Sequence, residues 1–255
     1  AALQGSTELD AQLHEAWINA AEDPDVDIPG WLRGGTPMGV EANMIPRGIF
    51  PEVNEQTPVD QRRPLEHYHD EFKNYRSAEL DEDATTALEE LVVSGFVRCF
   101  RTEAEAVAYL RGATPVSSKL ALVKNTKDGV TKCRLILDCR VSGSNDAATK
   151  VERVLLPKCW DVLRDIMALR KTCKHGEKVE LFVLDFRDAF YMMPLLAAEQ
   201  KYFTAYINGK WYIWTRVAQG SLNGPNAFGR LFGLDWPHHA RVRARRDGQG
   251  PDIRR

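Results

Sequence analysis

The sequence lacks any apolar run that approaches the roughly 20 residues of a bilayer-spanning helix, and no secretory signal opens it. We therefore expect no membrane partner and an intracellular location. An initiator Met is also missing, so we interpret the N-terminus as a cut end. Contents of 44% hydrophobic and 27% charged residues fit a globular protein, and 255 residues suffice for one large domain or two small ones.

A Cys-x-x-Cys pair is absent too, and the number of cysteines, 5, is odd. This pattern indicates free thiols in a reducing compartment. Two close pairs hold residue types that can bind zinc, Cys173 with His175 and His67 with His69. Neither pair has a partner pair at zinc spacing, so we expect no zinc site.

Strong net charge is a further absence, since the formal value is only -2 and does not by itself indicate a nucleic-acid partner. The distribution is more informative than the sum. Asp and Glu predominate in the first part of the chain, whereas Lys and Arg gather from Lys119 onward. Residues 240–255 are rich in Arg and almost free of apolar side chains, which predicts a disordered basic tail.

The first part of the chain alternates helical patterns with a proline-rich stretch. Helical spacing of apolar residues predicts an amphipathic helix over 8–20. Prolines and glycines interrupt any periodicity over 23–64, so we expect an extended arm that lies on a domain surface or links to something upstream. Two packing helices are then predicted, over 78–94 and 102–112.

Two hairpins are predicted from turn signals. Strands over 120–123 and 134–137 flank the Asp128-Gly129 turn, and the hairpin carries Lys124, Lys127, Lys132 and Arg134. A basic hairpin is usually a solvated turn, but Lys and Arg also bind phosphate groups. The second hairpin joins 202–207 to 210–215 through Asn208-Gly209, the strongest short hairpin signal.

Between the hairpins the pattern predicts a helix over 160–171, whose apolar stripe we interpret as core, and then a buried strand over 179–185. Asp185 ends that strand, where its carboxylate can face a cleft; the alternative is an ordinary turn-forming Asp. Two glycines and a proline over 216–225 predict a backbone that closely approaches something, and a helix follows over 226–231.

Three segments resemble motifs of the reverse transcriptases of retroelements and retroviruses. Leu184-Asp185-Phe186-Arg187-Asp188-Ala189-Phe190-Tyr191 is similar to the first catalytic motif of that family. Arg216-Val217-Ala218-Gln219-Gly220 followed by Pro225-Asn226-Ala227-Phe228 is similar to the next motif, and Lys132–Arg140 is similar to the fingers strand. The order of the motifs, over roughly residues 119–233, makes the match specific.

The resemblance implies an α+β fold, a right-hand polymerase with fingers and a partial palm. It divides the chain into an N-terminal helix and proline-rich arm (1–64), a fingers and partial palm region (65–234) and a basic disordered tail (235–255). The implied activity is RNA-directed DNA polymerisation by two-metal nucleotidyl transfer with Mg²⁺ or Mn²⁺. The implied partners are an RNA or DNA template-primer, a deoxynucleoside triphosphate and other domains of a polyprotein.

The resemblance also assigns roles to individual residues. Asp185 matches a metal-binding aspartate, with the backbone carbonyl of Phe186 beside it. Phe190 matches the aromatic residue that excludes a 2′-hydroxyl. The remaining positions are implied to bind the nucleotide; they are Asp188, Ala189, Gln219, Gly220 and Arg134 with Lys124 or Lys127.

The chain departs from the family in one respect that concerns activity. The family's third motif contains adjacent aspartates, and no two aspartates are adjacent in this sequence. We therefore expect a fragment that is inactive alone, and a non-catalytic nucleic-acid-binding relic is the alternative. A phosphatase with Asp185 as nucleophile is a further alternative, although such chemistry needs a second acid two residues on, where Arg187 stands.

Overall fold

The computed structural model describes residues 9–53, 65, 73–181, 186 and 188–235. Helices and strands both contribute, and the strands are antiparallel. The elements, in chain order, are α1 (Ala11–Ala21), α2 (Ile28–Gly34), α3 (Arg76–Glu79), α4 (Glu82–Val93), β1 (Val97–Phe100), α5 (Glu103–Tyr109), β2 (Lys119–Lys127), β3 (Val130–Asp138), α6 (Ser144–Ala147), α7 (Cys159–Thr172), the 3₁₀ helices η2 (Ala189–Met192) and η3 (Ala197–Tyr202), β4 (Thr204–Ile207), β5 (Lys210–Trp214) and α8 (Gly224–Asp235).

The hairpin predicted from Asn208-Gly209 is confirmed as β4 and β5. Both turn residues have positive φ, 51° and 71°, as a tight two-residue turn requires. Strand β1 adds to the other edge of β5, which gives a three-stranded sheet in the order β1-β5-β4. Ile213 and Trp214 of β5 are buried, so this strand is the centre of the sheet and of the core.

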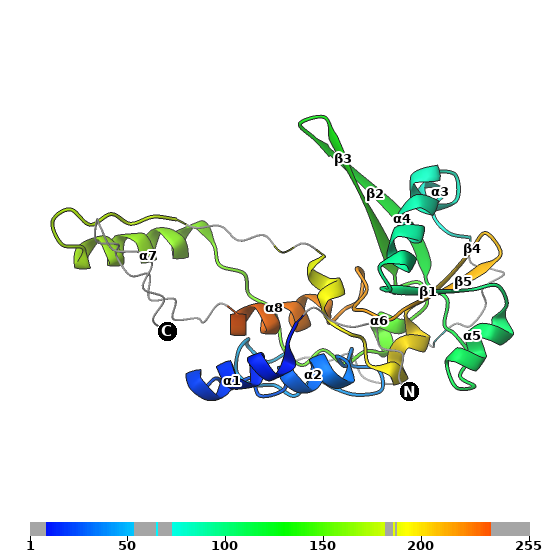
Figure 1. Ribbon diagram of the computed structural model, residues 1–255, viewed down its shortest axis with the longest axis horizontal. Helices are drawn as coiled ribbons and strands as arrows, with labels where there is room; N and C mark the ends of the chain where they lie inside the picture. Colours follow the sequence, from blue (N-terminus) through cyan, green and yellow to red (C-terminus); the bar gives the residue numbers. More distant parts are fainter. Residues whose placement is uncertain (1–8, 54–64, 66–72, 182–185, 187, 236–255) are drawn as a thin grey trace.

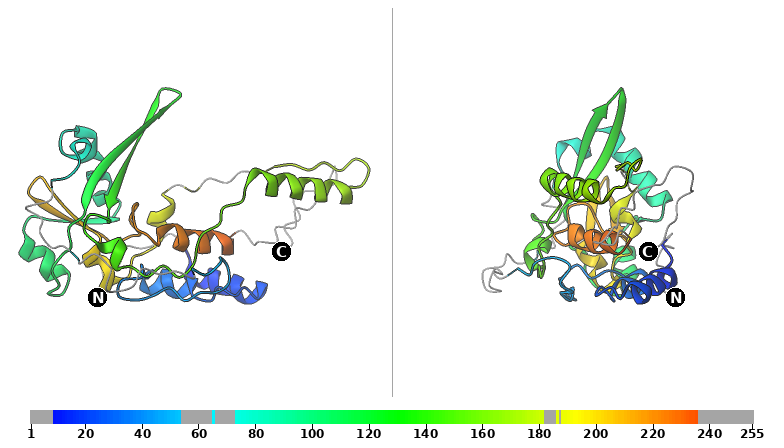
Figure 2. Two further views of the ribbon diagram at one scale, coloured as in Figure 1. Left: turned by 180° about the vertical axis from the view of Figure 1, so that it is seen from behind. Right: turned by 90° about the vertical axis from the view of Figure 1, so that its left-hand side faces the viewer.

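The second predicted hairpin is also confirmed and is longer than expected. β2 and β3 pair from Lys119↔Asp138 to Lys127↔Val130, and Asp128 and Gly129 form the turn with positive φ. This ribbon projects away from the rest of the protein in both orientations (Figures 1 and 2). Only its base is packed, since Leu120 and Leu137 are fully buried while both strands become exposed toward the turn.

Backbone hydrogen bonds join the ribbon to the three-stranded sheet. The Ser118 N–H donates to the carbonyl oxygen of Thr204 at 2.8 Å, and a parallel bridge links Ser117 with Thr204. The Asn74 side chain bridges the same two sheets. Its Oδ1 accepts from the Leu120 N–H and its Nδ2 donates to the Tyr206 carbonyl oxygen, both at 2.9 Å. These bonds fix the base of the ribbon relative to β4.

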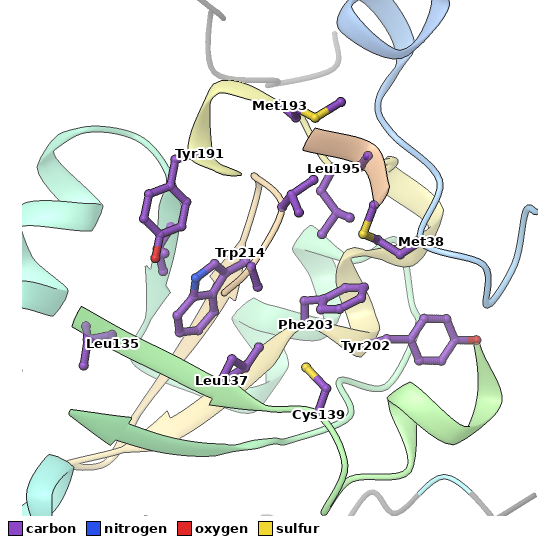
Figure 3. Close-up of a cluster of buried hydrophobic side chains, with 14 of the residues drawn as sticks. Met38, Leu135, Leu137, Cys139, Tyr191, Met193, Leu195, Tyr202, Phe203 and Trp214 are labelled. Carbon is purple, nitrogen blue, oxygen red and sulfur yellow. The ribbon is translucent and has the colours of Figure 1, made fainter. Parts of the chain in front are cut away.

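The hydrophobic core lies where the ribbon base, β5 and the segment 191–203 meet. Figure 3 shows Trp214 between Tyr191 and Leu137, with Phe203 and Cys139 nearby. All five residues are at most 6% exposed. Burial raises the pKa of the Cys139 thiol to about 12, so this cysteine acts as a small apolar core residue.

The extended surface arm expected over 23–64 is wrong for residues 23–53. Residues 28–34 form α2, and Ile28, Trp31 and Leu32 are buried with Met38 and Met44 in the main core. Pro29 does not prevent this helix, because it lies in the first turn, where its missing N–H would have no partner. Residues 54–64 lie outside the described residues, and the domain boundaries given above stay predictions.

The segment 25–47 is attached to α8 through a buried arginine. Arg230 is 1% exposed, and its guanidinium donates to both carboxylate oxygens of Asp25 and to Asp27. It also donates to the carbonyl oxygen of Ile45 at 2.8 Å and lies 4.4 Å from the ring centroid of Trp31. A buried charge is tolerated only when it is paired and hydrogen-bonded. Asp25, Asp27 and Ile45 must therefore stay close to Arg230, and this requirement fixes the position of the segment relative to α8.

A second buried charge holds the next turn of this segment. The Glu199 side chain is fully buried, and its carboxylate accepts hydrogen bonds from the backbone N–H groups of Met38, Glu41 and Ala42 at 2.6–3.0 Å. These backbone donors are thus satisfied by a side-chain carboxylate. Residues 38–42 are thereby fastened to η3.

The interpretation of residues 160–171 as a core helix is half wrong. The helix exists as α7, but none of its residues is buried, and Trp160 and Met167 are 78% and 63% exposed. Figure 1 shows α7 at one end of the protein, away from the sheets. The apolar stripe indicates that one face of α7 is suited to packing, but it does not identify the surface against which that face packs. No helix among the described residues combines the length and apolarity needed to cross a membrane.

The predicted buried strand over 179–185 is not found in its described part. Residues 179–181 are in no strand, and Leu181 is 70% exposed. Strand formation needs a hydrogen-bonded neighbour, and the sheets formed by the described residues do not include this segment. Residues 182–185 lie outside the described residues.

Replacing the buried carboxylate of Glu199 by an amide is a first test. Glu199→Gln should lower the free energy of unfolding by about 2 kcal/mol, because the amide turns N–H donors toward the N–H groups of residues 38–42. Urea unfolding measures this loss. In Glu105→Gln, where the side chain is exposed, the change should stay within about 0.5 kcal/mol. Equal effects of the two substitutions would contradict the buried contact.

The two tryptophans Trp214 and Trp160 offer a matched test of the core and of α7. Trp214→Ala should cost about 3–5 kcal/mol of unfolding free energy, because it leaves a cavity in the core. Trp160→Ala should cost less than about 1 kcal/mol, because its side chain already contacts solvent. Denaturation midpoints measure both. A large loss from Trp160→Ala would mean that α7 is covered in solution.

Candidate functional site

The turn at Gln219-Gly220 lies directly against strand β3. The Leu137 N–H donates to the carbonyl oxygen of Gln219 at 2.9 Å. Gly220 has a φ of +113°, and a Cβ at this position would lie 2.0 Å from the Leu137 carbonyl oxygen. Only glycine can therefore occupy position 220 without displacing the turn from the strand. The loop over 216–225 was predicted to approach something closely, and its partner here is the backbone of β3.

Asn145, which sequence analysis did not single out, holds the other side of the same turn. Its Nδ2 donates to the Gly220 carbonyl oxygen at 3.0 Å, and its Oδ1 accepts from the Leu222 N–H at 2.9 Å. The carboxamide thus pairs with the turn as a neighbouring strand would. No local pattern predicts this contact, because Asn145 and Gly220 are far apart in sequence.

The segment that follows Asp185 is packed on α8. The Phe186 ring meets the rings of Phe228 and Phe232 edge-on, with centroids 6.0 and 5.5 Å apart. Phe190 is half-buried, 5.9 Å from the Phe228 centroid. Asp185 itself lies outside the described residues, so its predicted convergence with Arg134 on one cleft stays a prediction.

Asp188 and Ala189, which precede Phe190, have a distinctive backbone. Asp188 is exposed and adopts a left-handed conformation with φ 55°, and half-buried Ala189 begins η2. A Cβ on Gly224 would lie 3.6 Å from Cε2 of Phe190, so the Phe190 ring packs at the start of α8. The turn at Gln219-Gly220 leads into that same helix. The structure therefore brings together Phe186, residues 188–190, residues 219–224 and the base of β3.

The basic residues of the ribbon are divided between its two faces. Arg134 pairs with Val123 and Lys127 pairs with Val130, and successive side chains of a strand alternate between faces. Arg134 and Lys127 therefore share one face, together with Lys132. Lys124 lies on the opposite face, on the same side as the buried residue Leu122.

Lys124 is bound by two carboxylates from the start of α4. Its Nζ lies 2.7 Å from Asp81 Oδ2 and 2.5 Å from Asp83 Oδ2. The hydrogen bond to Asp81, followed by that to Asp83, raises the pKa of Lys124 above its ordinary value, and the pKa of Asp81 is lowered by Lys124. Lys124 is thus held as a cation by its own protein.

Asp138 lies at the end of β3, on the same face as Arg134. It accepts hydrogen bonds from the Tyr75 hydroxyl at 2.7 Å and from the N–H and Nε of Arg140 at 3.2 and 3.3 Å. Burial raises the pKa of Asp138, but these donors outweigh it and lower the pKa overall. This carboxylate is therefore ionised and holds the Tyr75 segment against the base of the ribbon.

The described residues do not supply a ready metal centre. No group of three or more His, Cys, Asp or Glu side chains occurs within the parts of the chain that the structure describes. Asp185, the predicted metal ligand, lies outside them. Near Phe186 in sequence, the described residues include one carboxylate, that of Asp188, and it is exposed. We accordingly derive no metal-dependent step from this geometry.

Comparison with known proteins gives a limited result. No protein-family model matches the sequence, and no curated protein matches it. Among solved structures, a foamy viral protease-reverse transcriptase in complex with double-stranded DNA is similar at 15% identity and a TM-score of 0.43. The native prototype foamy virus protease-reverse transcriptase is similar at 16% identity and a TM-score of 0.42.

Both likenesses extend over most of this chain but a small part of the other. They cover 91% of this chain, and 39% and 25% of the respective foamy virus chains. The structural resemblance to reverse transcriptases is therefore weak, and it assigns no role to any side chain.

A substitution at Gly220 tests the packing of the turn. Gly220→Ala should lower the unfolding free energy by at least about 2 kcal/mol and speed hydrogen exchange of the Leu137 amide, because the new Cβ displaces the turn from β3. Gly30 is the matched control, since nothing lies within 4 Å of its ideal Cβ and its φ is not positive. Gly30→Ala should be neutral or stabilise by up to about 1 kcal/mol. Unchanged exchange at Leu137 in Gly220→Ala would refute the contact.

Proposed function

We propose that this chain is a fingers and partial palm fragment of a reverse transcriptase, a polymerase that copies an RNA or DNA template into DNA. One observation supports this most: segments that resemble separate polymerase motifs meet in space. The Gln219 carbonyl oxygen bonds the N–H of Leu137, and Phe190 packs at the start of α8 beside Gly224. Such an arrangement is needed when distant residues act on one triphosphate.

The proposed roles follow from the chemistry of each group. Arg134, with Lys124 or Lys127, contacts the triphosphate, because guanidinium and ammonium groups bind phosphate oxygens. The turn at Gln219-Gly220 lies against the incoming nucleotide, where a backbone without a side chain allows close approach. Asp188 and Ala189 support the nucleotide pocket.

The Phe190 ring is proposed to exclude a ribose 2′-hydroxyl by occupying its space. This ring packs against Phe228 while the residue as a whole is only half-buried, which is compatible with a steric gate. Asp185, with the Phe186 carbonyl, is proposed to hold Mg²⁺ or Mn²⁺. When bound, such an ion supplies charge neutralisation for the triphosphate and the leaving pyrophosphate.

The proposal includes the absence of activity in the chain as it stands. Two-metal transfer needs several carboxylate oxygens between ions about 3.5–4 Å apart. The adjacent aspartates that supply them in reverse transcriptases are missing from the sequence. Nucleic-acid binding without polymerisation is therefore the proposed behaviour of this fragment.

Primer extension and binding test the two parts of the proposal together. A labelled primer-template should bind weakly, and its affinity should fall steeply with salt, because Lys and Arg contacts to phosphate release counterions. Extension of oligo-dT on poly-rA with Mg²⁺ or Mn²⁺ should be absent. Asp185→Asn is the control in the extension assay.

Two results would contradict the proposal in different ways. Failure to bind the primer-template even at about 50 mM salt would remove the polymerase assignment. Extension that disappears in Asp185→Asn would instead show a competent active site, completed by a carboxylate outside the recognised motifs.

A further inference from the structure

The two faces of the β2–β3 ribbon differ in what they offer to a phosphate group. We call the face that carries Val123, Lys127, Val130, Lys132 and Arg134 the basic face, and the face that carries Lys124 and Cys133 the helix-facing side, since it packs toward α4. The register of the hairpin determines this division. Beyond the buried base both faces are exposed, so exposure alone does not distinguish them.

The helix-facing side is electrostatically unsuitable for a polyanion. Its cation, Lys124, is shared by Asp81 and Asp83, so this cluster of one cation and two anions carries a net negative charge. Cys133 Sγ lies 3.9 Å from Asp83 Oδ2 on the same side. A phosphate that approached Lys124 would have to displace two carboxylates and would meet their repulsion.

The basic face has the opposite character. Lys127, Lys132 and Arg134 are exposed, and none of them forms an ion pair with a carboxylate of the described part of the chain. Lys132 and Arg134 are two residues apart on one strand, about 6.8 Å along the ribbon. That repeat suits neighbouring phosphates of an extended strand. Val123 and Val130, 50% and 61% exposed, are the cross-strand partners of Arg134 and Lys127 and offer apolar contact to sugars.

We propose that a single nucleic-acid strand binds along the basic face of the ribbon only, and that Asp81 and Asp83 withhold Lys124 from it. This inference rests on the proposed function, because it specifies which surface of the fragment meets nucleic acid. It also distinguishes the two lysines as ligands of the strand, because only Lys127 lies on the proposed binding face. The contact is to the phosphate backbone and is therefore independent of base sequence.

The experiment compares matched charge removals in the full chain by fluorescence anisotropy with a labelled single-stranded oligo-dT. Lys127→Gln should weaken binding several-fold and reduce the slope of log K against log salt by about 0.7, the loss of one phosphate contact on a single strand. Lys124→Gln removes the same charge three residues away. It should change the affinity less than twofold and leave the slope unaltered. The Arg-rich residues 241–255 are present in every variant and contribute equally to each.

The reciprocal variant releases Lys124. Asp81→Asn with Asp83→Asn should raise the affinity several-fold and steepen the slope by about 0.7, and adding Lys124→Gln should abolish this gain. Asn at position 81 still caps α4, where Asp81 now accepts from the Asp83 N–H, so the fold should be retained. Unfolding midpoints check this. If the double variant fails to fold, the comparison of Lys124→Gln with Lys127→Gln decides alone.

The outcomes separate this inference from the proposed function. Equal losses in Lys124→Gln and Lys127→Gln would overturn the division of the faces while leaving nucleic-acid binding intact. A gain in the double Asn variant that survives Lys124→Gln would also overturn it, because the gain would then come from lost negative charge and not from Lys124. If the unaltered chain fails to bind the strand at low salt, the proposed function itself fails.

Discussion

The structure depends on how a fully buried arginine is neutralised. Arg230 projects from α8 into the protein, where the buried Glu152 carboxylate lies 3.8 Å from Nη1, and its charge is tolerated because Asp25, Asp27 and the Ile45 carbonyl oxygen accept its hydrogen bonds. Those partners come from the proline-rich segment near the start of the chain. Removing one partner would leave an unpaired charge in a low-dielectric interior, so the segment and the helix hold each other in place. The same helix begins at the turn of the candidate site, which is thereby fixed to the core.

The sequence predicted correctly those elements that are determined by residues close to one another in the chain. Both hairpins were found from two-residue turns, because Asn208-Gly209 and Asp128-Gly129 adopt positive φ at small cost whatever surrounds them. Helix caps are similarly local, and the Thr102 side chain accepts from the Glu105 N–H as the capping pattern predicts. Errors arose where the outcome depended on distant partners. An apolar stripe in α7 was mistaken for core, and prolines over 23–53 were mistaken for an exposed arm.

The candidate site shows the same division in more detail. The close approach at Gly220 was anticipated from glycine and proline in the loop, but its partner, the Leu137 carbonyl oxygen, was not. The contact of Asn145 with Gly220 could not be predicted from the sequence, because no local pattern around an asparagine indicates which distant backbone group it will bind. The division of the ribbon side chains between two faces, by contrast, could be predicted from the sequence. A two-residue turn at Asp128-Gly129 sets the register, and the register alone places Lys127 on the same face as Arg134 and Lys124 on the other face.

That register restricts how the ribbon can vary among related sequences. Adding one residue to each strand between the base and the tip would turn every cation beyond the insertion to the other side, toward the carboxylates of α4. Adding two to each strand would lengthen the ribbon by about 7 Å and preserve its chemistry. Viable ribbons of different reach should therefore form a series with steps of two residues per strand. The alternation of side chains along a strand therefore restricts the length of the ribbon to steps of two residues per strand, while it does not restrict the identity of the residues at the tip.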